Sequence, residues 1–212
     1  ILSFGGIDAV IEFAVSAESP SLVGSSLGAI ADKDIDIEIL PSRLVTEDQQ
    51  LKKFIGDFIW RRQGRLGWEW VDELYRKEWS ITQITHFLSY LPFTDEAWER
   101  ANIWLGKSAK EYWIRTSAAP YDTKGDMGEA INKLIEHGRP HAAIHCLAYM
   151  HHNKLPLDRL QTVAALLGAV SSGEPSSAVD IYHIGELIKA LQDDPDTNPD
   201  DLFSVEWAYL PM

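Results

Sequence analysis

The side chains most able to do chemistry form a histidine cluster in the second half of the sequence. Five histidines and the one cysteine of the chain fall within sixteen positions: His137, His141, His145, Cys146, His151 and His152. His141 and His145 stand four residues apart in a segment with helical periodicity, a spacing that two ligands of one metal ion can share. One interpretation of the cluster is therefore a metal-dependent enzyme that uses the histidines from His137 to His152.

Other features of the sequence disfavour catalysis. Neither HExxH nor its inverted form is present, since no acidic residue lies between His141 and His145. Cys146 lies in an apolar helical segment, where a cysteine is usually buried and inert. The glycines at 24 and 28 lack the Lys-Ser/Thr ending of a phosphate-binding loop. We therefore expect no enzymatic activity, no metal and no cofactor.

A basic cluster provides a second candidate site. It consists of Lys52, Lys53, Arg61, Arg62 and Arg65 on one predicted helix, and it could contact nucleic-acid phosphates. The formal net charge of the chain is -13, however, and both end segments are strongly acidic, so a polyanion would be repelled. The alternative interpretation is a solvated helix face with ion pairs to neighbouring acids, and nucleic acid is disfavoured as a partner.

Aromatic residues are concentrated in the middle of the chain. Seven tryptophans lie between Trp60 and Trp113, and such residues together with Arg are enriched at binding hot spots, although they also form helix-packing cores. Trp68 and Trp70 cannot both face inward on one regular helix. The predicted binding residues are Trp68, Trp70, Trp98, Trp104, Tyr112, Trp113, Arg61, Arg62 and Arg65.

Composition narrows the class of protein. The 212 residues are 45% hydrophobic and include 8 Trp, which is enough to bury a substantial core. No segment approaches the roughly 20 apolar residues that a membrane span needs, and a single cysteine gives no disulfide framework. We expect a cytoplasmic chain without membrane contact. Because the sequence starts at Ile1 and stops in a helix-like segment, we also expect a fragment of a longer protein.

The elements that would position these residues are predicted to be helices. Thr46–Gln49 and Ser80–Gln83 have the pattern of capping boxes, and Gly64, Gly67 and Gly106 have the pattern of helix ends. The run Asp34–Ile39 alternates acidic and apolar residues, which favours an extended segment. We therefore predict two parts: a helical segment with an acidic extended linker over 1–45, and a helical-repeat domain over 46–212.

The spacing of the predicted helices indicates a repeat. Helix starts fall near residues 95, 108, 127, 140, 157, 178 and 199, so successive pairs have lengths in the range of helix-pair repeats. The predicted fold is all-α, an irregular α-α superhelix of the HEAT or tetratricopeptide type with about ten helices. Such pairs bury a core by stacking and leave an extended face for binding, so a protein partner, or another domain of the same chain, is the expected ligand.

Several short strings resemble the helical arms of large bacterial multidomain proteins, some of which are built around STAND-type NTPase cores. The strings are Leu91-Pro92-Phe93 with Trp98, Glu111-Tyr112-Trp113, Gly138-Arg139-Pro140-His141-Ala142-Ala143, and Glu206-Trp207-Ala208-Tyr209-Leu210-Pro211. They cover about residues 60 to 212, and none is an enzymatic signature. The resemblance implies a C-terminal sensor or scaffold arm whose catalytic machinery lies outside this sequence.

Overall fold

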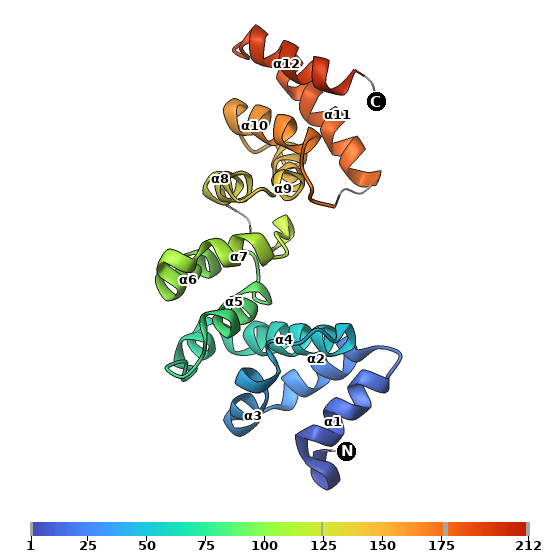
Figure 1. The fold of residues 1–212 in the computed structure, drawn as a ribbon, viewed down its shortest axis with the longest axis vertical. Helices are drawn as coiled ribbons and strands as arrows, with labels where there is room; N and C mark the ends of the chain where they lie inside the picture. Colours follow the sequence, from blue (N-terminus) through green and yellow to red (C-terminus); the bar gives the residue numbers. More distant parts are fainter. Residues whose placement is uncertain (1, 124, 176–177, 211–212) are drawn as a thin grey trace. The chain divides into compact units, whose positions relative to one another are not determined.

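The chain is helical wherever its structure is described. The computed structural model describes residues 2–123, 125–175 and 178–210, and these ranges contain twelve α-helices, two short 3-10 helices and no strand (Figure 1). The prediction of an all-α protein is confirmed, with two more α-helices than the ten expected. None of the helices in these ranges combines the length and the apolar character that crossing a bilayer requires.

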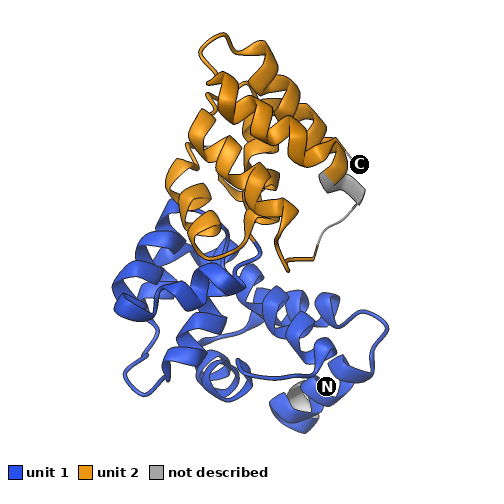
Figure 2. Cartoon of the chain, turned by 45° about the horizontal axis from the view of Figure 1, so that its top comes forward, with its two compact units in different colours: residues 1–117 blue, residues 118–212 orange. Residues whose placement is uncertain are grey.

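The chain divides into two compact units. Unit 1 comprises residues 1–117 and unit 2 comprises residues 118–212 (Figure 2). The boundary predicted after residue 45 falls inside unit 1, because the helices before it pack against the long helix that follows it.

Unit 1 begins with four helices held together by a close helix crossing. They are α1 (Leu2–Ser16), α2 (Pro20–Ile30), α3 (Lys33–Arg43) and α4 (Gln49–Glu73). Gly24 and Gly28, one turn apart on α2, face the backbone of α4. A Cβ atom on Gly28 would lie 2.7 Å from the carbonyl oxygen of Phe58, and one on Gly24 would overlap the carbonyl oxygen of Phe54. The two glycines therefore allow α2 to approach α4 at backbone distance.

The acidic run is helical, and the predicted extended segment was wrong. Asp32 caps α3 by accepting a hydrogen bond from the Ile35 amide at 3.1 Å, and acids in the first turn interact favourably with the helix dipole. The buried residues Asp36, Ile39 and Leu40 have helical spacing, while Ile37 is exposed. The alternation of acids and isoleucines has the period of a strand, but the buried residues follow the helical period and include the acid Asp36.

Helix α4 is interrupted where the sequence predicted a helix end. Gly67 has φ of 74°, in the left-handed region that favours glycine, and it separates two helical segments. The second segment stops at Glu73. The N-cap of the long helix is Asp48 and not Thr46, so the cap lies two residues later than predicted.

Three shorter helices complete unit 1: α5 (Ile81–Ser89), α6 (Asp95–Leu105) and α7 (Lys110–Arg115). The capping box of Ser80 and Gln83 is present, which confirms that prediction, and Gly106 with φ of 51° ends α6 as expected. α5 contacts both α6 and α7. The core between them is aromatic: the ring centroids of Phe93 and Trp98 are 4.9 Å apart.

Unit 2 consists of five helices with a regular pattern of contacts: α8 (Gly128–Glu136), α9 (Pro140–His152), α10 (Arg159–Val170), α11 (Ala178–Asp193) and α12 (Pro199–Tyr209). Each helix contacts the next one in the chain. In addition α8 contacts α10, α10 contacts α12, and α9 contacts α11. Unit 2 therefore has two layers, one with α8, α10 and α12 and the other with α9 and α11.

Candidate functional site

Most of the predicted aromatic binding residues lie in the core of unit 1. Trp70 and Trp98 are each 5% exposed, Trp113 is 1% exposed and Tyr112 is fully buried. Side chains at this depth form the packing between helices and offer no surface to a partner in this conformation. The sequence argument about Trp68 and Trp70 agrees with their placement, since Trp70 is buried and Trp68 is only half-buried.

The two remaining predicted tryptophans stack with arginines. The guanidinium of Arg100 lies 4.5 Å from the ring centroid of Trp68, and that of Arg76 lies 3.6 Å from the ring centroid of Trp104. Arg100 also binds the carboxylate of Asp72, with Nε 2.9 Å from Oδ1. This arginine lowers the pKa of the Asp72 carboxyl. The faces of Trp68 and Trp104 that meet these guanidiniums are therefore occupied within unit 1.

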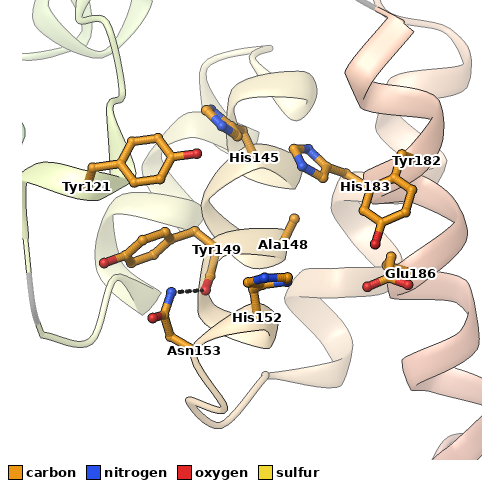
Figure 3. Close-up of a pocket in the computed structure, with 9 residues that line it drawn as sticks. All are labelled: Tyr121, His145, Ala148, Tyr149, His152, Asn153, Tyr182, His183 and Glu186. Atoms are coloured by element: carbon orange, nitrogen blue, oxygen red, sulfur yellow. Dashed lines mark hydrogen bonds between the residues drawn. The ribbon is translucent and has the colours of Figure 1, made fainter.

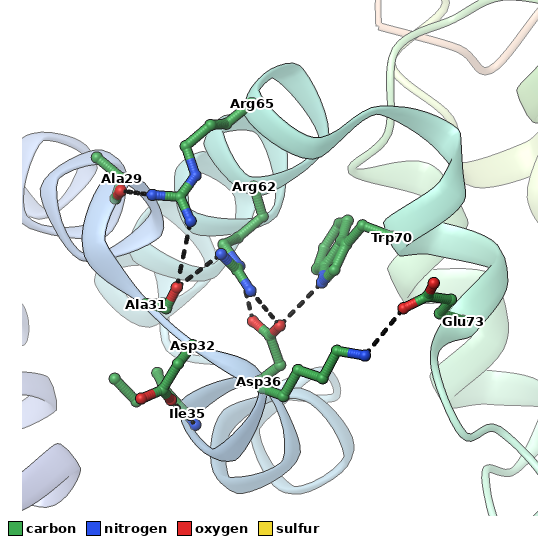
Figure 4. Close-up of polar contacts among 10 residues, drawn as sticks. Ala29, Ala31, Asp32, Ile35, Asp36, Arg62, Arg65, Trp70 and Glu73 are labelled. Carbon is green, nitrogen blue, oxygen red and sulfur yellow. Dashed lines mark hydrogen bonds and ion pairs between the residues drawn. The ribbon is translucent and has the colours of Figure 1, made fainter.

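The predicted arginines have different environments. Arg62 is 2% exposed and forms a two-pronged ion pair with Asp36, in which Nε lies 2.9 Å from Oδ1 (Figure 4). Trp70 Nε1 donates to the same carboxylate at 2.9 Å, and Arg62 Nη1 donates to the carbonyl oxygen of Ala31 at 2.7 Å. Arg65 binds the carbonyl oxygen of Ala29, whereas Arg61 is exposed.

The basic cluster therefore does not form one cationic surface. One of its five residues, Arg62, is buried in the network that joins α3 to α4, and the Lys52 ammonium lies 3.4 Å from a carboxylate oxygen of Glu47. The Arg62–Asp36 pair joins two helices of unit 1, so this part of the cluster has a structural role.

The predicted histidine cluster is spread over several surfaces of unit 2. His137 follows α8, whereas His141, His145, His151 and His152 lie on α9. In the described part of the chain, no group of three or more His, Cys, Asp or Glu side chains is placed to hold a metal ion. Cys146 is fully buried, and this burial raises the pKa of its thiol to about 12, so a reactive thiolate is disfavoured.

The structure instead brings two of these histidines into an aromatic pocket on unit 2 (Figure 3). The cavity has a volume of about 380 Å³. We call it the aromatic pocket and define it by its nine lining residues: Tyr121, His145, Ala148, Tyr149, His152, Asn153, Tyr182, His183 and Glu186.

The helices explain why these residues meet. His145, Ala148, Tyr149 and His152 follow the spacing of one face of α9, and the residues from α11 face them because α9 packs against α11. Ala148 has the smallest side chain of the nine, and Figure 3 shows it between the flanking rings. The third contribution, Tyr121, comes from the 3-10 helix Pro120–Asp122 that precedes α8.

Contacts between rings give the pocket its shape. The imidazoles of His145 and His183 are stacked, with centroids 5.5 Å apart and an angle of 16° between their planes. Tyr121 meets Tyr149 edge to face at 5.2 Å and His145 at 5.9 Å. Tyr182 meets His183 edge to face at 6.0 Å. Edge-to-face and stacked arrangements are the ones that aromatic pairs prefer, so these contacts favour the observed arrangement of the pocket walls.

The start of α9 is fixed by a carboxylate from a distant part of the chain. Glu174 accepts hydrogen bonds from the backbone amides of His141 at 2.7 Å and Ala142 at 3.3 Å, and it pairs with Arg139 at 3.1 Å. A carboxylate at this position satisfies amides that the first helical turn leaves unpaired. The network holds in place the helix that supplies four of the pocket residues.

A second cavity of about 380 Å³ lies in unit 1, between α3 and the segment after α4. Its lining is mainly apolar, with Ile37, Leu40, Pro41, Leu74, Tyr75 and Trp79, and it includes Asp36 and Glu78. Asp36 is already engaged by Arg62 and Trp70. The aromatic pocket is the stronger candidate because it combines stacked rings with several polar groups, as ligand sites generally do.

Sequence reasoning found only part of the aromatic pocket. His145 and His152 were singled out, but their neighbours Tyr182, His183 and Glu186 were not, because they lie thirty or more positions away on α11. The available signal was the sequence His145-x-x-Ala148-Tyr149-x-x-His152, which places four residues on one helix face around a small one. These observations define the class of protein: a helical fold that carries an aromatic pocket.

Comparison of the chain with protein-family models, with curated proteins and with solved structures finds no significant match in any of the three.

Proposed function

We propose that this chain is a non-catalytic interaction module of the helical-repeat kind and that the aromatic pocket binds a protein partner or another domain of the same protein. The observation that carries the proposal is the pocket itself, lined by stacked rings on the α9 and α11 layer of unit 2. Side chains on one layer of stacked helix pairs are the usual binding surface of α-solenoids.

The contacts within unit 2 support the finer description as an irregular α-α superhelix. Helices of one layer meet every second helix along the chain, as α8, α10 and α12 do, and this is the pattern of stacked helix pairs. Such a module can serve as the sensor or scaffold arm of a larger cytoplasmic protein of the STAND NTPase type. That larger role rests on the resemblance of the short sequence strings alone.

Selection of peptides from a random phage-displayed library tests the proposal. We expect the purified chain to enrich peptides whose binding is lost in Tyr182→Ala, because Tyr182 is 61% exposed and lines the pocket. Phe203→Ala is the matched control, since Phe203 is an aromatic residue of unit 2 with 63% exposure that does not line the pocket. Failure to enrich any peptide, or equal binding by both variants, would contradict the proposal.

A further inference from the structure

We propose that the aromatic pocket recognises a cation, namely the ammonium group of a lysine or methylated lysine side chain presented by a basic segment of the partner. This inference rests on the proposed function and specifies the chemistry of its ligand. Three features of the pocket carry it: the aromatic faces, the single carboxylate and the charge of the unit around it.

The aromatic faces favour a cation. The face of a tyrosine ring carries partial negative charge, so a cation within about 6 Å of the ring centroid is attracted. Tyr121 and Tyr182 are 70% and 61% exposed, and Figure 3 shows them on opposite sides of the pocket. Each of these exposed rings offers a surface to which the charged head or the alkyl stem of a lysine can bind.

Glu186 provides the one formal charge of the pocket when histidines are neutral. Its side chain is half-buried, and in the described part of the chain its carboxylate makes no hydrogen bond or ion pair. Figure 3 shows it beside Tyr182 and facing the side of the pocket where His152 lies. A carboxylate without a partner next to aromatic faces suits an ammonium ion and repels a phosphate or carboxylate ligand.

The net negative charge of unit 2 also favours a cationic ligand. Residues 118–212 contain 14 acidic and six basic residues, and the whole chain has a net charge of -13. The resulting field attracts a basic segment and repels an acidic one, and it is screened by salt. The charge therefore favours a basic segment of a protein over a neutral or acidic peptide.

Titration of three short peptides into the 212-residue chain, followed by NMR, tests this assignment. The peptides share the sequence Gly-Gly-X-Gly-Gly with acetyl and amide ends, and X is trimethyl-lysine, lysine or the neutral lysine analogue norleucine. We expect the trimethyl-lysine peptide to bind about tenfold more tightly than the norleucine peptide, which corresponds to a cation–π and carboxylate contribution of ordinary size. Choline chloride, a free trimethylammonium ion, serves as a fourth probe and should bind more weakly than the trimethyl-lysine peptide.

Variants connect the binding to the pocket. Tyr182→Ala and Glu186→Gln should each weaken binding of the trimethyl-lysine peptide about fivefold to tenfold. Phe203→Ala and Glu129→Gln should leave it unchanged, since they remove an exposed ring and an exposed carboxylate of unit 2 outside the pocket. All four positions tolerate these changes structurally, because none of the four side chains is buried.

Several results would overturn the inference. Equal affinity for the norleucine and trimethyl-lysine peptides would show that the pocket does not recognise charge, and choline binding as tightly as the peptide would assign the pocket to free organic cations. If the three peptides do not bind while library-selected peptides still bind at Tyr182, the cation assignment fails and the proposed function stands. If no peptide binds in either experiment, both the cation assignment and the proposed function are wrong.

Discussion

Arg62 and Asp36 have nearly fully buried charged groups, each 2% exposed, and the pair joins α4 to α3. Trp70 completes the pairing of the carboxylate. The cost of taking these charges out of water is offset only while every partner is present, so the network is sensitive to the loss of a single member.

Removal of the guanidinium should therefore destabilise unit 1 strongly. We expect Arg62→Met to lower the free energy of unfolding by about 3–5 kcal/mol, because it leaves the Asp36 carboxylate buried without its cation. Urea unfolding followed by circular dichroism measures the loss. Arg61→Met is the matched control: Arg61 precedes Arg62 on α4 but is exposed, and its replacement should change stability by less than about 0.5 kcal/mol. Equal losses in the two variants would contradict this account.

His86 introduces a pH dependence into unit 1. It is 6% exposed, and burial, with a smaller effect from the charge of Arg115, lowers the pKa of its imidazole. The folded state therefore binds a proton less readily than the unfolded state, and stability falls as the pH drops below about 6.5, the ordinary pKa of histidine. Replacing His86 by Gln should reduce the difference in unfolding free energy between pH 7.5 and pH 5.5. An unchanged difference would assign the acid sensitivity to other groups.

At the scale of elements, the crossing of α2 and α4 depends on two glycines, which have no side chain. Gly24 and Gly28 face the carbonyl oxygens of Phe54 and Phe58, so the helices approach more closely than side chains would permit. Elsewhere on α4, Gly64 faces open space and has no such role.

Alanine substitution should therefore have opposite effects at these positions. Gly28→Ala places a Cβ atom 2.7 Å from a backbone oxygen, and overpacking of this kind costs about 1–3 kcal/mol. Gly64→Ala adds a better helix former in open space and should stabilise the chain by about 0.5–1 kcal/mol. Thermal denaturation of both variants measures the contrast. A stabilised Gly28→Ala variant would show that α2 and α4 are not in close contact.

At the scale of the whole molecule, each of the two units contains buried apolar residues of its own. Apolar residues such as Leu134, Ile144, Leu147, Leu166 and Leu187 are fully buried within unit 2, and the helices that carry them contact one another. In unit 1 the buried face of α4 is covered by α2 and α1, which lie before the boundary predicted from the sequence.

Fragments cut at the two candidate boundaries should thus behave differently. We expect residues 118–212 alone to be helical and to unfold cooperatively, as measured by circular dichroism during heating. Residues 46–117 alone should lose ordered structure or aggregate, because Phe54, Ile55, Phe58 and Ile59, fully buried in the complete unit, would be exposed. The opposite result, with residues 46–117 folded and residues 118–212 unfolded, would instead support a domain boundary near residue 45.

Local sequence signals predicted most of the helices, although not the helix that contains Asp34–Ile39. Apolar periodicity, the capping box at Ser80, the helix end at Gly106 and the proline at the start of α9 are signals within a few residues of each other, and the structure has helices where they predict them. These signals suffice because hydrogen bonds, caps and backbone preferences in a helix act between near neighbours in the chain.

Burial and long-range contacts depend on tertiary packing. Asp36 pairs with Arg62, which lies 26 residues away in the sequence, and the ring of His145 stacks on that of His183 because α9 packs against α11. The physical reason is that helical periodicity defines a face of a helix but not the helix that will cover it. Burial, charge pairing and pocket formation depend on contacts between residues far apart in the sequence, and those contacts arise only when the helices pack.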